Sequence, residues 1–462
     1  MYQIDFNKPQ HIYFMGIGGI SMSGLAEILL KEGFRISGSD AHPSQLTSHL
    51  EQLGARIYIG QSAANIDQEP GIDVAVYTAA IHEDNPELKA VRERGIPVLT
   101  RAQLLGEMMR NYRQAVAVAG THGKTTTTSM LTEILMEARK DPTISVGGML
   151  DAIGGNIRVG GPEMFVTEAC EYTNSFLSFF PTMEIILNIE ADHLDFFKDI
   201  DDIRNSFRRF AGLLPEDGIL IINSDIREYE EICKGLPCRV ITVGSDPVRS
   251  RYSAAHVAFD ESACASYELL ENGKKVCTVV LGVPGMHNVY NSLAAFAAAR
   301  ELGVDDGDIC AGLLAYRGTH RRFEKKGVLN GVTIIDDYAH HPQEIAATLS
   351  TAENYPHREL WCVFQPHTYT RTRALMDDFA EALSAADHVV LADIYAARET
   401  DTLGISSSML AEKIAGLGTD AWYFPSFSEI EEFLLEKCGS GDLLITMGAG
   451  DIVKVGENLL KK

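Results

Sequence analysis

The stretch Ala115-Val116-Ala117-Val118-Ala119-Gly120-Thr121-His122-Gly123-Lys124-Thr125-Thr126 decides the fold class of this chain. It begins with a short apolar run, continues through a glycine-rich turn, and leads into residues 126–139, which have helical periodicity. A strand that passes through a glycine turn into a helix is the unit from which parallel α/β sheets are built. Gly-Lys-Thr in such a turn is also typical of a loop that binds phosphate.

The same pattern of strand, turn and helix recurs on both sides of this stretch. Apolar runs predict further strands at residues 11–15, 74–78, 96–99, 164–167, 185–189, 219–222, 332–335, 360–364, 388–392 and 443–446. At about 150 residues per domain, a chain of 462 residues corresponds to about three domains. We therefore predict an α/β protein with a Rossmann-like domain over residues 1–108, a central parallel-sheet domain of the P-loop ATPase type over 109–317, and a Rossmann-like domain over 318–462.

Composition excludes several classes of protein. Apolar residues make up 45% of the chain and charged residues 23%, which is ordinary for a globular protein. The net charge is -24, from 64 acidic and 40 basic residues, so a nucleic-acid partner is not expected. No run approaches the ~20 apolar residues that span a bilayer, and the first ten residues lack a signal-peptide pattern. We expect a cytoplasmic protein without membrane insertion, and composition leaves open whether it is a monomer or a dimer.

The glycine turn has the residues that phosphate binding needs. Glycines let backbone amides close around phosphate oxygens, Lys124 supplies a positive charge, and the Thr125 hydroxyl is a ligand for Mg²⁺. Val118 stands where the first glycine of the usual motif would be, so the loop is a shortened variant. A turn that merely ends a strand is the alternative. The predicted phosphate-binding residues are Gly120, Thr121, His122, Gly123, Lys124, Thr125 and Thr126.

Two residues that follow nearby strands are candidates for holding Mg²⁺. Glu168 ends the run 164–167, and His193 follows the run 185–189. Because the carboxyl ends of parallel strands share one edge of a sheet, both side chains are expected beside the phosphate loop. A carboxylate suits Mg²⁺, and a histidine suits a second metal position between γ-phosphate and an acceptor carboxylate. Taken alone, each is more typical of a helix cap or a surface position.

A second glycine turn near the amino terminus resembles a dinucleotide-binding turn. It follows the run 11–15, and the carboxylate at the end of the next strand stands where a ribose hydroxyl would be met. Ser21 replaces the third glycine, so a diphosphate ligand fits but NAD does not follow. A cofactor, a nucleotide sugar and a mere tight turn remain comparable alternatives. The candidate residues are Gly16, Gly18, Gly19, Ile20, Ser21 and Asp40.

Polar residues in the rest of the chain suggest further contacts. Asn288 and Asn291 share one face of an alanine-rich helix, where they can pair with adenine, although helix capping is favoured on spacing alone. Arg322, just past the second domain boundary, is either solvated or in reach of nucleotide phosphates. Arg371 follows the strand 360–364 and can bind a small carboxylate ligand.

The order of these motifs resembles that of the Mur ligase family over essentially the whole chain. The matching features are the loop 120–125, Glu168, the Asn-Ile-Glu-x-Asp-His segment from Asn188, the His-Asn-x-x-Asn helix, Arg321-Arg322-Phe323-Glu324 and Asp336-Asp337-Tyr338-x-His340-His341-Pro342. Together with residues 16–24 and Phe364-Gln365-Pro366-His367, the set is most similar to members that attach L-alanine to UDP-N-acetylmuramate. Members that attach a whole tripeptide share much of it.

The resemblance implies a role for each domain. The first would hold the UDP-sugar, the second ATP, and the third the amino acid. Carried over by position, Lys124, Glu168, His193 and Arg322 would be catalytic, and Thr125, Glu168 and His193 would bind the metal. Asn288, Asn291, Arg322 and Asp337 would contact ATP, and Tyr338, His340 and Arg371 would contact the amino acid.

The implied reaction agrees with the residue chemistry. Phosphorylation turns a carboxylate oxygen into a leaving group, and phosphoryl transfer needs mainly positioning and positive charge. The expected substrates are UDP-N-acetylmuramate, L-alanine and ATP with Mg²⁺. Two competitors remain: a pyridine-nucleotide oxidoreductase, which leaves the phosphate loop without a purpose, and a non-catalytic module gated by ATP.

Overall fold

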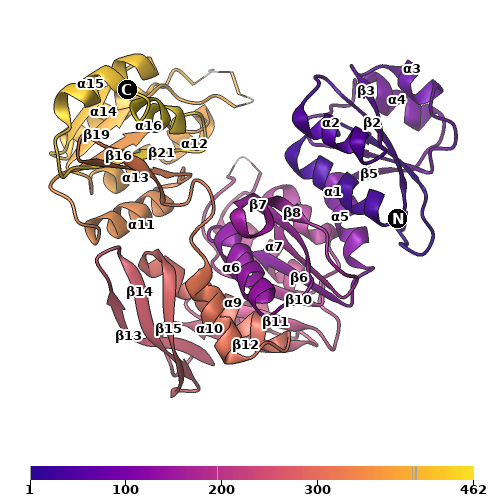
Figure 1. Cartoon of the computed structure of the whole chain (residues 1–462), viewed down its shortest axis with the longest axis horizontal. Helices are drawn as coiled ribbons and strands as arrows, with labels where there is room; N and C mark the ends of the chain where they lie inside the picture. Colours follow the sequence, from indigo (N-terminus) through magenta and orange to yellow (C-terminus); the bar gives the residue numbers. More distant parts are fainter. Residues whose placement is uncertain (1, 195, 398, 401–402) are drawn as a thin grey trace. The chain divides into compact units, whose positions relative to one another are not determined.

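The computed structural model describes residues 2–194, 196–397, 399–400 and 403–462 (Figure 1). The chain forms two compact units. The first comprises Met1–Tyr252 and Ala294–Gly312, and the second comprises Ser253–Leu293 and Leu313–Lys462. No helix in the described ranges is long and apolar enough to cross a membrane.

The first unit begins with a five-stranded parallel sheet in the order β3-β2-β1-β4-β5. This order places the turn after β1 at the point where the strand order reverses, which is where ligands bind in open α/β sheets. The strands are β1 (His11–Met15), β2 (Arg35–Asp40), β3 (Arg56–Ile59), β4 (Val74–Tyr77) and β5 (Val98–Thr100). The helices are α1 (Ile20–Lys31), α2 (Gln45–Gln52), α3 (Ala63–Asp67), α4 (Pro86–Glu93) and α5 (Arg101–Met109).

A second sheet of the first unit has the order β12-β11-β10-β6-β9-β7-β8. Its strands are parallel except β8, which pairs antiparallel with β7. The strands are β6 (Gln114–Ala119), β7 (Thr143–Leu150), β8 (Gly155–Arg158), β9 (Met164–Ala169), β10 (Met183–Ile186), β11 (Ile219–Asn223) and β12 (Arg239–Gly244). The associated helices are α6 (Lys124–Glu137), η1 (Asp151–Ile153), η2 (Tyr172–Ser178), α7 (Ile200–Ala211) and α8 (Tyr229–Cys233).

The second unit contains a ribbon and a six-stranded sheet. The ribbon consists of β13 (Tyr252–Phe259), β14 (Cys264–Glu271) and β15 (Lys274–Pro284), and β14 pairs antiparallel with β15. The sheet has the order β16-β17-β21-β18-β19-β20, with only β16 antiparallel. Its strands are β16 (Glu324–Leu329), β17 (Val332–Asp337), β18 (Leu360–Phe364), β19 (His388–Leu391), β20 (Asp420–Tyr423) and β21 (Leu443–Met447).

Helices cover both faces of this last sheet, and a separate apolar core lies under each face. The helices are α11 (Pro342–Glu353), α12 (Tyr369–Ala374), α13 (Met376–Leu383), α14 (Ser407–Gly416), α15 (Phe427–Lys437) and α16 (Val453–Leu459). Two more helices, α9 (Met286–Glu301) and α10 (Asp306–Ala315), follow the ribbon. The three parallel-sheet regions confirm the predicted α/β fold class.

Candidate active site

The phosphate loop of the first unit connects β6 to α6, as the sequence predicts. Gly120 has φ +146° and Gly123 has φ +82°, backbone conformations that favour glycine. Gly123 precedes α6 without a side-chain cap, so the first backbone amides of that helix are not capped by its own N-cap residue.

Asn188, which follows β10, holds this loop by hydrogen bonds to the backbone of Thr121 and His122. Its Oδ1 accepts a hydrogen bond from His122 N at 2.8 Å, and its Nδ2 donates to His122 O at 3.1 Å. Thr121 N donates to Asn188 O at 3.2 Å. Asn188 thus sets the shape of the loop. The motif that contains it indicated a metal ligand, His193, and gave no hint of this role.

Lys124 is largely but not fully buried at the loop, and its ammonium already has partners. Its Nζ donates to Gly120 O, to Thr121 O at 3.0 Å and to Glu171 Oε2 at 3.1 Å. Burial disfavours the charged ammonium, but the Glu171 carboxylate, with Cys170 and Glu168, raises the pKa of Lys124 above its ordinary value. The group is therefore a stable cation at neutral pH, and Glu171, three residues after Glu168, is a site residue that the sequence prediction missed.

Glu168 and His193 both lie near Lys124. Glu168 Oε1 accepts a hydrogen bond from Gly147 N at 2.5 Å. His193 Nε2 lies 3.8 Å from Glu171 Oε1, and its ring stacks on Tyr172 with centroids 4.5 Å apart. Lys124 and His193 thus both contact the Glu171 carboxylate, and Glu168 lies close enough to Lys124 to stabilise its charge.

The oxygen donors at this place fit a hard divalent cation. The carboxylates of Glu168 and Glu171 and the hydroxyl of Thr125 are ligands that Mg²⁺ prefers. Within the described part of the chain, no three His, Cys, Asp or Glu side chains are gathered closely enough to hold a metal on their own. A cation here needs further oxygen ligands from water or a phosphate, which is the usual situation for Mg²⁺.

The amino-terminal glycine turn joins β1 to α1. Gly16 has φ +81°, and Gly18 N donates to Asp40 Oδ2 at 2.8 Å. Asp40 therefore ties the turn to the end of β2. Arg101, the first residue of α5, donates from Nη1 to Ser21 Oγ at 3.0 Å. Arg101 was not among the predicted site residues.

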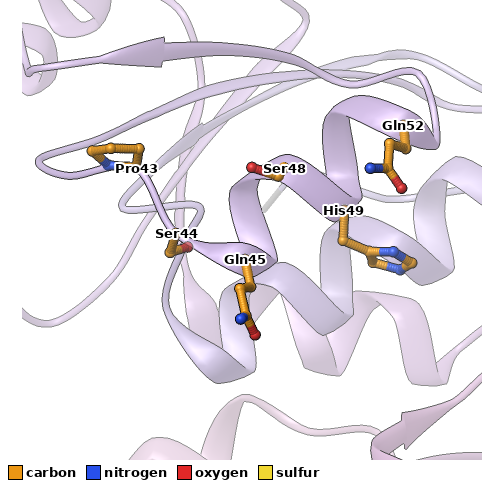
Figure 2. Close-up of a pocket in the computed structure, with 6 residues that line it drawn as sticks. All are labelled: Pro43, Ser44, Gln45, Ser48, His49 and Gln52. Carbon is orange, nitrogen blue, oxygen red and sulfur yellow. The ribbon is translucent and has the colours of Figure 1, made fainter.

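A hollow of about 470 Å³ opens on the same domain beside α2. Figure 2 shows its lining: Pro43 and Ser44 precede the helix, and Gln45, Ser48, His49 and Gln52 lie on it. Ser44 caps α2, and His49 Nε2 lies 3.3 Å from Glu27 Oε2. None of the predicted site residues lines this hollow.

In the second unit, the two adjacent arginines have different surroundings. Arg321 Nε donates to Asp336 Oδ2 at 3.0 Å, and its Nη2 donates to Gly448 O at 2.6 Å. Both guanidinium groups lie over the Tyr338 ring, Arg321 at 4.9 Å and Arg322 at 5.3 Å, but Arg322 has no ion pair with any residue that the structure describes. Arg322, the predicted residue, is thus the one whose charge is available to a ligand.

Asp337, at the end of β17, holds this segment. Its Oδ2 accepts a hydrogen bond from Phe323 N at 2.7 Å, and its Oδ1 accepts one from Ala339 N at 2.8 Å. Burial raises the pKa of Asp337 to about 6, although Arg322 and these two amides oppose the rise. The Asp337 carboxylate therefore has a structural role, because it holds the backbone at Phe323 and Ala339.

The predicted amino-acid residues lie at the carboxyl ends of β17 and β18. His340 Nδ1 lies 3.0 Å from Tyr338 O, and its ring centroid is 5.8 Å from that of His367. Arg371 Nη1 lies 3.4 Å from His367 Nδ1, and the His367 ring stacks on Tyr395. His367 therefore contacts both His340 and Arg371, and Tyr338 contacts His340. His367 was not among the predicted amino-acid-binding residues.

Asn288 and Asn291 lie on one face of α9, as predicted, and bond to each other. Asn291 Nδ2 donates to Asn288 Oδ1 at 3.0 Å, and Asn288 Nδ2 donates to Pro284 O at 2.7 Å. Both side chains are buried. The hydrogen bond from Asn288 to Pro284 connects α9 to the end of β15. This contact supports the structural role that spacing alone favoured.

Comparison with known sequences defines the class of protein. Residues 11–113 match the family model described as "Mur ligase family, catalytic domain", residues 118–299 match "Mur ligase middle domain", and residues 321–450 match "Mur ligase, glutamate ligase domain". The chain belongs to the Mur ligase family, which confirms the resemblance in its motifs.

Individual relatives show which members of the family this chain is most similar to among those compared. The UDP-N-acetylmuramate–L-alanine ligase of Lachnospira eligens is 64% identical over 461 residues, and that of Agathobacter rectalis is 59% identical over 462; each match covers 100% of both chains. The crystal structure of UDP-N-acetylmuramate–alanine ligase from Thermotoga maritima has a TM-score of 0.80 at 29% identity, and a murein peptide ligase from Psychrobacter arcticus has 0.69 at 27%. Both cover 98% of this chain and 98% of their own.

Proposed function

We propose that this protein joins the amine of L-alanine to the carboxylate of UDP-N-acetylmuramate while ATP is cleaved to ADP and phosphate. The observation that carries the proposal is the Lys124 ammonium held at the phosphate loop, in a chain 64% identical over its full length to a UDP-N-acetylmuramate–L-alanine ligase. In this role the enzyme supplies a peptidoglycan precursor in the cytoplasm.

In this proposal ATP phosphates lie against residues 120–126, where Lys124 exchanges Glu171 for phosphate oxygens. Thr125, Glu168 and His193 would hold Mg²⁺, which supplies positive charge to the phosphates when bound. Asn288, Asn291, Arg322 and Asp337 are the residues we assign to ATP in the second unit. The unpaired guanidinium of Arg322 supports its assignment to the transferring phosphoryl group.

The other two substrates are assigned to the remaining clusters. UDP is placed at the first glycine turn, with Gly16, Gly18, Gly19, Ile20, Ser21 and Asp40. L-Alanine is placed at Tyr338, His340 and Arg371, where a guanidinium can pair with the amino-acid carboxylate. The contacts of His367 with both His340 and Arg371 support one compact amino-acid site.

The chemistry proceeds in two balanced steps. A muramyl carboxylate oxygen attacks the γ-phosphorus of ATP, the bond from that phosphorus to ADP breaks, and an acyl phosphate forms. The L-alanine nitrogen then attacks the acyl carbon, the carbon–oxygen bond to phosphate breaks, and amide, inorganic phosphate and a proton result. Lys124 and Arg322 neutralise charge on the transferring group, which is the main requirement of phosphoryl transfer.

The test supplies ATP, Mg²⁺ and UDP-N-acetylmuramate together with L-alanine, glycine, L-serine or a tripeptide. Phosphate release and product mass are measured for each mixture. We expect phosphate and product in equal amounts, with L-alanine giving the highest kcat/KM. Phosphate release that ignores the muramyl substrate would overturn the ligase proposal, and preferential use of the tripeptide would assign the protein to the tripeptide ligases.

A further inference from the structure

Arg101 is a charged side chain that the proposed reaction has not yet used. It is the first residue of α5, it is half-buried, and it follows β5 at the carboxyl edge of the first sheet. Among the residues that the structure describes, Ser21 is its only hydrogen-bond partner, and no carboxylate lies within ion-pair distance of it. The guanidinium carries five N–H donors, so most of them are available.

This position is unfavourable for an arginine unless an anion is present. A half-buried charge without a counter-ion loses hydration that the single hydrogen bond to Ser21 replaces only in part. This burial lowers the pKa of Arg101, and the Cys170 thiol opposes the fall only in part. A cation in the first turn of a helix also opposes the helix dipole. The start of α5 does not need Arg101, because Thr100 and Gln103 already form a capping box.

The one partner of Arg101 points to the nature of the missing anion. Ser21 belongs to the glycine turn that we assign to the UDP-sugar, and it lies in the first turn of α1. The Gly18 amide of that turn is occupied by the Asp40 carboxylate. A diphosphate at the turn therefore meets a negative charge on the Asp40 side and needs a cation to offset it, and Arg101 is placed to supply one.

We propose that Arg101 binds the diphosphate of the UDP-sugar substrate, with its guanidinium positioned by Ser21. This inference rests on the proposed function, since it takes the glycine turn as the UDP site. A guanidinium forms paired hydrogen bonds to phosphate oxygens, which lysine does not reproduce.

The experiment compares Arg101→Met and Arg101→Lys with Arg92→Met. Arg92 is an exposed arginine of the same domain that pairs with Glu83, so its loss controls for a change in net charge. Binding of UDP and of UDP-N-acetylmuramate is measured by calorimetry on the full chain. We expect Arg101→Met to raise both dissociation constants about ten- to a hundred-fold, Arg101→Lys to raise them several-fold, and Arg92→Met to leave them unchanged.

Other results of these binding measurements would overturn either the role of Arg101 or the proposed function. Unchanged affinity for UDP in both Arg101 variants overturns the inference, and so does weakening confined to UDP-N-acetylmuramate, because it would place Arg101 on the muramyl group. If Arg101→Met fails to fold, the lysine variant carries the test alone. A wild-type chain that binds neither nucleotide would overturn the proposed function itself, whereas wild-type binding with unaffected variants would overturn only the role of Arg101. The KM for ATP should stay unchanged throughout.

Discussion

At the scale of single residues, the neighbours Arg321 and Arg322 have different roles: Arg321 stabilises the fold, and we assign Arg322 to the ligand. Both guanidinium groups lie over the Tyr338 ring, but Arg321 also bonds to the fully buried Asp336 and to a backbone carbonyl. Arg322 has no ion pair among the residues that the structure describes, and its charge partly offsets the burial that raises the pKa of the nearby Asp337. The motif Arg-Arg-Phe-Glu does not reveal which arginine does which.

We predict that Arg321→Met and Arg322→Met have opposite effects. Loss of Arg321 leaves the Asp336 carboxylate buried without its partner, so the free energy of unfolding should fall by about 3 kcal/mol. Loss of Arg322 should leave that free energy within about 0.5 kcal/mol of wild type but lower kcat at least a hundred-fold. Urea titration and phosphate release measure the two quantities. Equal losses of stability in both variants would contradict the assignment.

Lys124 gives a second prediction at this scale. Lys124→Ala should reduce turnover about a hundred- to a thousand-fold or more, because the phosphoryl group loses its main cation in the loop. The exposed Lys198→Ala is the matched control and should be fully active. Near-UV circular dichroism checks that the fold is kept. Wild-type turnover in the Lys124 variant would refute the site.

Some residue roles were predictable from sequence and others were not. Lys124 was found because strand, glycine turn and helix all agree at one place. Glu171 was recognisable only as a second carboxylate three residues after Glu168, and its contact with Lys124 depends on the irregular turn after β9. Arg101 had no local signal, since its partner Ser21 lies 80 residues earlier in the chain.

At the scale of elements, strand β10 carries an acidic residue into the core. Glu184 is fully buried, lies in register with Ala117 and Leu220, and has no hydrogen bond to its carboxylate from any described residue. Burial raises its pKa well above the ordinary value. The folded protein therefore keeps a proton that the unfolded chain has already lost above its own pKa of about 4.3.

We predict that this proton makes the fold less stable as pH rises. Above the unfolded pKa, stability should fall by up to about 1.4 kcal/mol per pH unit until the folded pKa is reached. Glu184→Met lacks this slope, so its stability advantage over wild type should grow from pH 5 to pH 8 in denaturant titrations. The exposed Glu216→Met is the control. Parallel pH profiles for Glu184→Met and wild type would show that the carboxylate is not buried as described.

Helix α5 gives a prediction about packing. A Cβ at Gly106 would collide with the backbone carbonyl of Ser178 in η2, whereas one at Gly307 in α10 would meet nothing within 4 Å. Gly106→Ala should therefore lower the free energy of unfolding by about 1–3 kcal/mol, and Gly307→Ala should leave it equal or raise it by up to about 1 kcal/mol. Thermal and denaturant unfolding measure both. Similar effects of the two substitutions would contradict the close approach of α5 to η2.

Elements were predictable where the chain buries both faces of a strand. The runs that became β6, β10 and β21 are continuous and apolar, as parallel strands covered by helices require. The ribbon β13 to β15 was not predicted. Its strands alternate buried and exposed residues, and β13 is largely exposed toward its end, so the hydrophobic signal is diluted.

At the scale of the whole molecule, the family assignment and the acidic composition are compatible. The net charge of -24 excludes a general anion-binding surface, so anionic substrates require local cations. Lys124, Arg322 and Arg101 are such cations, the first held by a carboxylate that a phosphate can replace and the other two without an ion pair among the described residues. The order of motifs predicts three domains in succession, and the bounds of these domains stay a prediction.

The central claim is that the muramyl carboxylate is activated by phosphorylation before the amine attacks. The most direct measurement uses UDP-N-acetylmuramate labelled with ¹⁸O in both carboxylate oxygens, with ATP, Mg²⁺ and L-alanine, and mass spectrometry of the released phosphate. The account predicts one ¹⁸O in each phosphate and one ¹⁸O in the amide product. Unlabelled phosphate formed together with product would contradict it, because the phosphate oxygen would then have come from water.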